Sequence, residues 1–62
     1  MNNPYITSIM PLIRTWLSMP LDSAKPAMRA FMLLEGEHSA LDFDLLDCSE
    51  TVEESIGLIF GV

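Results

Sequence analysis

Residues 8–20 have the sequence SIMPLIRTWLSMP, and residues 23–35 have the related sequence SAKPAMRAFMLLE. A shift of fifteen positions aligns the two segments, and the matches include Pro11 with Pro26, Arg14 with Arg29, and Trp16 with Phe31. In both segments the apolar residues recur at helical spacing. Two units are too few for a solenoid, which needs at least three to bury a continuous core. The repeat therefore predicts two similar helices that pack on each other as a hairpin.

Serine and proline define the expected start of each helix. We expect the first helix to begin with Ser8 as its N-cap, because Pro11 then lies in the first turn, where its missing N–H breaks no hydrogen bond. Pro4 would open a separate short turn before it. A helix that ran on from Pro4 would instead contain Pro11 and lose the hydrogen bond to the Thr7 carbonyl.

The same pattern sets the limits of the second helix. Pro20 ends the first helix, because the residue before a proline is disfavoured in the helical conformation. Ser23 is then expected to cap the second helix, with Pro26 in its first turn. Gly36 is suited to the left-handed conformation that closes it.

Two structures fit residues 39–47, which have the sequence SALDFDLLD. Leu41, Phe43 and Leu45 alternate with aspartates, as in a strand. Ser39 followed by Asp42 is instead typical of a helix N-terminus. We favour a short helix, because a lone strand has no edge to pair with unless another chain supplies one.

The last element is predicted to be a helix that begins at Asp47 or Ser49. Thr51 and Glu54 have the spacing of a capping box. The residues Val52, Ile56, Ile59 and Phe60 then share one face. Gly57 could allow a close approach between helices.

The expected fold class is all-α: a small helical hairpin plus one or two short acidic C-terminal helices, in one domain over residues 1–62. A chain of 62 residues is near the lower limit for independent folding. One cysteine allows no intrachain disulfide, and half of the residues are apolar, so we expect a homodimer to complete the fold. The predicted core consists of Ile9, Leu12, Ile13, Trp16, Met28, Phe31, Met32, Val52, Ile56 and Ile59.

Charge is distributed unevenly along the chain. The net charge is −6; residues 1–34 carry a net of +2, and residues 35–62 carry eight carboxylates, no Lys or Arg, and a net of −8. This excludes a typical nucleic-acid-binding protein, which needs clustered basic residues. It favours a protein partner with a basic surface. The predicted partner-binding residues are Asp42, Asp44, Asp47, Glu50, Glu53 and Glu54.

Carboxylates at this density can imitate the phosphate spacing of a nucleic acid and so occupy a basic groove of a partner. The alternative is that they only keep an apolar chain soluble. A calcium loop is not supported, because the central glycine of an EF-hand is missing. His38 and Cys48 show no spacing that supports a catalytic pair, and Cys48 is expected to be a small buried residue. We therefore predict no enzyme activity, no metal and no cofactor.

An apolar contact surface is the second candidate site. Methionine surfaces adapt to partners, and tryptophan often anchors interfaces, although core packing is the simpler interpretation. The candidates are Trp16, Met19, Met28, Phe31, Met32 and Phe60. Since no apolar run approaches the roughly 20 residues of a membrane span and no signal peptide is evident, we expect a cytoplasmic protein.

The functional hypothesis is a small acidic protein-binding regulator that inhibits or sequesters its partner, as is typical of small acidic regulators from phages and mobile elements. The partner would present a basic or apolar groove. The alternative is a structural subunit or docking module of a larger complex, which would bind through the methionine and aromatic face.

Overall fold

The computed structural model describes residues 3–62, which form four α-helices: α1 (Pro4–Leu17), α2 (Leu21–Glu35), α3 (Ala40–Cys48) and α4 (Val52–Phe60). No strand occurs within these residues, so the all-α prediction is confirmed. The strand alternative for residues 39–47 is wrong, because this segment is helical from Ala40 onward.

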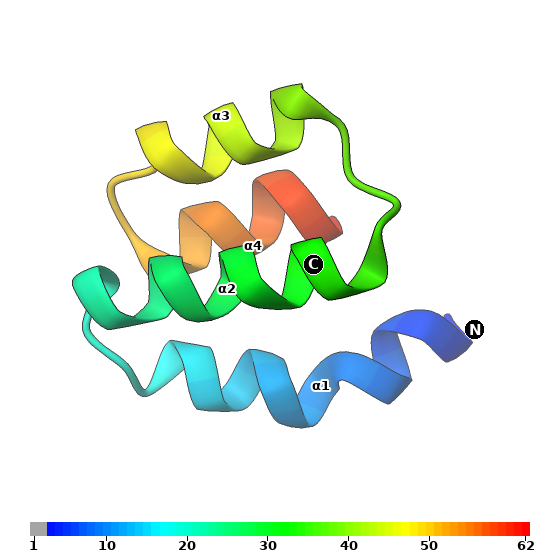
Figure 1. The fold of residues 1–62 in the computed structure, drawn as a ribbon. Coiled ribbons are helices and arrows are strands. Elements are labelled where there is room, and N and C mark those ends of the chain that lie inside the picture. The colour runs from blue at the N-terminus through cyan, green and yellow to red at the C-terminus, as the bar shows by residue number, and fades with distance from the viewer. Residues whose placement is uncertain (1–2) are drawn as a thin grey trace.

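Successive helices run in opposite directions, and the hairpin of α1 and α2 is followed by a second hairpin of α3 and α4 (Figure 1). α2 and α4 contact each other, and each also contacts both α1 and α3. In the part of the chain that the structure describes, α1 and α3 do not contact each other. The four helices therefore form a small bundle with α1 and α3 on opposite sides.

Helix α1 begins earlier than predicted. Asn3 is its N-cap, with a side chain that accepts from the Tyr5 N–H at 2.9 Å, and Pro4 takes the first helical position. Ser8 lies inside the helix, where its hydroxyl donates to the Tyr5 carbonyl at 2.6 Å. The expected start at Ser8 is therefore wrong, and Pro11 lies within a continuous helix.

Packing explains why α1 continues through its proline. Ile9 and Ile13, on either side of Pro11 in the sequence, are both buried, and Ile6 packs against the same core. Pro11 itself is exposed. Apolar burial on both sides of the proline thus stabilises one helix despite the missing hydrogen bond.

Helix α2 also begins before its predicted cap. Pro20 occupies the N-cap position in an extended conformation, and its carbonyl accepts from the Ser23 and Ala24 N–H groups at 3.0 and 2.9 Å. Ser23 therefore lies in the first turn and does not cap the helix, and Pro26 lies inside α2 and not in its first turn as predicted. The predicted end is confirmed, because Gly36 has φ 71° and its N–H donates to the Met32 carbonyl at 3.1 Å.

The caps of α3 and α4 follow the local sequence. Ser39 and Asp42 form a reciprocal capping box on α3. Helix α4 begins at Val52, later than the expected start at Asp47 or Ser49, and Thr51 caps it by accepting from the Glu54 N–H at 3.0 Å. The predicted capping box is not completed, because the Glu54 carboxylate accepts from the Glu50 N–H at 2.7 Å and not from the Thr51 N–H.

The core lies between all four helices and is formed by nine buried apolar residues: Ile9, Ile13, Trp16, Ala24, Met28, Met32, Leu46, Val52 and Ile56. Seven of them belong to the predicted core, whereas Ala24 and Leu46 do not. Phe31 and Ile59 are half-buried and pack against this core.

Two burial predictions are wrong. Leu12 is 39% exposed, because it lies at the edge of the buried stripe of α1. Cys48 is exposed, because the last turn of α3 turns Leu46 inward instead. Gly57 also has no close-packing role, since an added Cβ would meet only the Val62 carbonyl oxygen at 3.6 Å.

A pair of buried serines joins α3 to α4. The Ser49 hydroxyl donates to the Leu46 carbonyl at 2.8 Å, and the Ser55 hydroxyl donates to the Thr51 carbonyl at 3.1 Å. The two hydroxyls also contact each other. Because each buried oxygen has partners, the tight connection between the helices leaves no uncompensated polar group.

Candidate functional site

The six predicted partner-binding carboxylates divide into two groups of three. Asp42, Asp47 and Glu54 are engaged by other groups of the same chain. Asp44, Glu50 and Glu53 have exposed side chains that no other side chain within residues 3–62 contacts by a hydrogen bond or ion pair. We call Asp44, Glu50 and Glu53 the acidic surface.

Asp47 is the carboxylate that joins the basic part of the chain to the acidic part. Its side chain forms an ion pair with Arg29 of α2. The Lys25 ammonium donates to the Asp47 backbone carbonyl at 2.8 Å. Two of the three basic side chains in the sequence thus contact the same residue of α3.

Asp42 belongs to a polar network at the connection between α2 and α3. Its carboxylate accepts from the Ser39 N–H at 3.2 Å and lies 3.4 Å from His38 Nδ1. His38 Nε2 lies 2.7 Å from a Glu35 oxygen. The Tyr5 hydroxyl donates to both Glu35 oxygens at 2.9 Å. His38 thus lies between two carboxylates, and the network ties α1, α2 and α3 together.

The acidic surface lies on two elements and the segment between them. Asp44 is in α3, Glu50 is in the connection to α4, and Glu53 is in the first turn of α4. A carboxylate in a first turn interacts favourably with the helix dipole. The buried serine pair and the Thr51 cap hold the connection that carries Glu50 between α3 and α4.

The predicted apolar contact surface lies largely inside the protein. Trp16, Met28 and Met32 are buried, and Met19, Phe31 and Phe60 are half-buried against them. The Trp16 ring meets Phe31 edge-on at 5.5 Å between centroids and stacks on Phe60 at 5.6 Å. These residues therefore join α1, α2 and α4 into one core.

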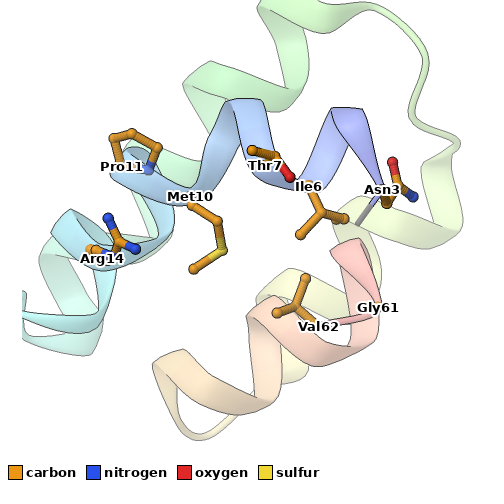
Figure 2. A pocket seen from close by; sticks show the side chains of 8 residues that line it. All are labelled: Asn3, Ile6, Thr7, Met10, Pro11, Arg14, Gly61 and Val62. Atoms are coloured by element: carbon orange, nitrogen blue, oxygen red, sulfur yellow. The ribbon is translucent and has the colours of Figure 1, made fainter. Parts of the chain in front are cut away.

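A groove that the sequence did not predict lies between α1 and the residues that follow α4 (Figure 2). It is open and has a volume of about 630 Å³. Its lining includes Ile6, Thr7, Met10, Pro11, Arg14 and Val62. The α1 residues recur every three or four positions and so share one face. No sequence signal distinguished this groove, because Pro26 and Arg29 repeat the spacing of Pro11 and Arg14 in α2.

Neither a metal site nor a membrane-spanning helix is found in the described part of the chain. No group of three or more His, Cys, Asp or Glu side chains within residues 3–62 is arranged to hold a metal ion. None of the four helices is long and apolar enough to span a bilayer.

Comparison with family models, with curated proteins and with solved structures found no match to this chain.

Proposed function

We propose that this chain is a non-enzymatic regulator that binds a protein partner through the acidic surface and thereby inhibits or sequesters that partner. One observation carries the proposal: Asp44, Glu50 and Glu53 remain exposed and unpaired within residues 3–62, whereas Lys25 and Arg29 both contact Asp47. Exposed, unpaired carboxylates favour a partner with a basic surface.

The charge distribution supports the same partner chemistry. Arg29 and Lys25 both contact Asp47, so the basic side chains of α2 do not neutralise the acidic surface. A negative surface accelerates the approach of a positively charged partner at low ionic strength. If that partner binds nucleic acid, the carboxylates would occupy positions otherwise taken by phosphates.

The alternative of a docking module that binds through the methionine and aromatic face has less support. Trp16, Met28 and Met32 would have to leave the core before a partner could contact them. Their exposure would remove the packing that holds four short helices together. We therefore retain the acidic surface as the proposed binding site.

Affinity capture from the native host tests the proposal. The tagged chain and the variant D44N/E50Q/E53Q serve as baits at low and at moderate ionic strength, and bound proteins are identified by mass spectrometry. We expect a partner with a basic surface, captured by the unmodified chain at low salt and depleted by salt and by the triple variant. Capture of the same partner by the triple variant at equal yield would contradict the proposal.

A further inference from the structure

The groove between α1 and Val62 combines an apolar floor with polar groups on α1. Ile6, Met10 and Val62 supply the apolar contacts, and Figure 2 shows Val62 facing Ile6 and Met10 across the groove. Arg14 lies at one end of this lining and Asn3 at the other. A volume of about 630 Å³ falls in the range of ligand-binding pockets.

Arg14 differs from the other two basic side chains of the protein. Lys25 and Arg29 both contact Asp47, whereas no ion pair of Arg14 with another side chain is found between residues 3 and 62. Its guanidinium is exposed at the groove. The groove is therefore complementary to a carboxylate, which an arginine can bind with two parallel hydrogen bonds.

We propose that this groove binds a short extended segment of a protein partner that carries an apolar side chain close to a carboxylate. The apolar side chain lies between Met10, Ile6 and Val62, and the carboxylate pairs with Arg14. The open shape suits a peptide, and one arginine over an apolar floor does not suit a nucleic acid, which requires several basic contacts. This site is separate from the acidic surface, which selects basic partners.

A selection from a phage-displayed library of random dodecapeptides tests the proposal, with the 62-residue chain as bait. Peptides that bind the groove should combine an apolar residue with Asp or Glu, whereas basic peptides should bind the acidic surface. The strongest acidic peptide is then synthesised, its Kd is measured, and its site is mapped by amide chemical-shift changes. We expect those changes at Ile6, Thr7, Met10 and Val62.

Matched variants decide whether the interaction uses the proposed groups. R14Q should weaken binding of the acidic peptide about tenfold, whereas R29Q, at the equivalent position of the repeat, should leave it unchanged. The inference is overturned if no apolar–acidic peptide is enriched, if R14Q binds as tightly as the unmodified chain, or if the shifts lie outside the groove. Binding of basic peptides is scored separately, so either site can fail without the other.

Discussion

Tyr5 and Glu35 connect the first turn of α1 to the last turn of α2, although thirty positions separate them in the sequence. The pKa of Tyr5 is raised from 10.0 to about 12, first because folding shields part of the side chain from water, and second because its hydroxyl donates to Glu35. The negative charges of Glu35 and Glu37 act in the same direction. The pKa of the Tyr5 hydroxyl thus depends on the packing of α1 against α2.

This shift predicts the alkaline behaviour of the protein. A pKa raised in the folded state contributes stability that is fully present below pH 10 and is lost as the pH rises to about 12. Because Tyr5 is the only tyrosine, an ultraviolet absorbance titration reports on it alone. We expect a midpoint near 12, and in E35Q a lower midpoint that remains above 10, because the shielding persists. A midpoint near 10 in the unmodified chain would show that the contact is absent.

The ion pair between Arg29 and Asp47 is predicted to add little stability. Its side chains are 41% and 56% exposed, so water screens the attraction. We expect D47N to lower the free energy of unfolding by less than about 1 kcal/mol in a urea titration. A loss above about 2 kcal/mol would mean that the pair is far better shielded than the structure indicates.

At the scale of the elements, Pro11 within α1 and Pro26 within α2 conflict with local helix propensity. An interior proline destabilises a helix by about 3 kcal/mol relative to alanine. Its restriction of the unfolded chain lowers the entropy lost on folding, but this stabilises the protein by less than about 1 kcal/mol. Pro11 is exposed, so its replacement removes no core packing. Pro11 therefore makes α1 less stable than its sequence could allow.

We expect P11A to raise the free energy of unfolding by about 1 to 2 kcal/mol, because it restores the hydrogen bond to the Thr7 carbonyl. Urea unfolding followed by circular dichroism measures this change. A decrease in stability would show that the proline is needed for the packing of α1.

Local signals predicted the end of α2 and the start of α3 correctly. Gly36 and Ser39 act on their nearest neighbours, so the sequence around them was sufficient. Ser8 and Ser23 carry the same capping chemistry, yet both lie inside helices, because apolar contacts made by the residues before them extend each helix toward its N-terminus. Tertiary packing outweighed propensity at these two positions.

The division of the carboxylates was not predictable in the same way. Asp44 and Asp47 are three positions apart in one helix and have the same local chemistry. Only the position of α2 beside α3 gives Asp47 a partner in Arg29 and leaves Asp44 without one. The groove likewise requires α1 and Val62 to meet, although 48 positions separate Arg14 from Val62.

At the scale of the whole molecule, the bundle leaves several large apolar side chains in contact with water. Leu34 is 86% exposed, and Leu33, Leu41 and Leu58 are at least half exposed. A bundle of four short helices has a small core, and burial of these leucines would add stability. We therefore still predict a homodimer, in which these leucines would be buried.

Light scattering at micromolar concentration measures the oligomeric state directly. We expect the mass of two chains, and a shift toward one chain in the variant L34S/L41S. A stable monomer at every concentration would contradict the dimer prediction and would show that the four helices suffice alone.

The central claim is that the acidic surface, and not negative charge in general, binds the partner. The affinity of the captured partner for two variants of equal charge tests this claim most directly. E50Q/E53Q and D22N/E37Q each remove one carboxylate from a connection between helices and one from the first turn of a helix. Titration calorimetry should show about a tenfold loss of affinity for E50Q/E53Q and an affinity close to that of the unmodified chain for D22N/E37Q. Equal affinities of the two variants would contradict the account.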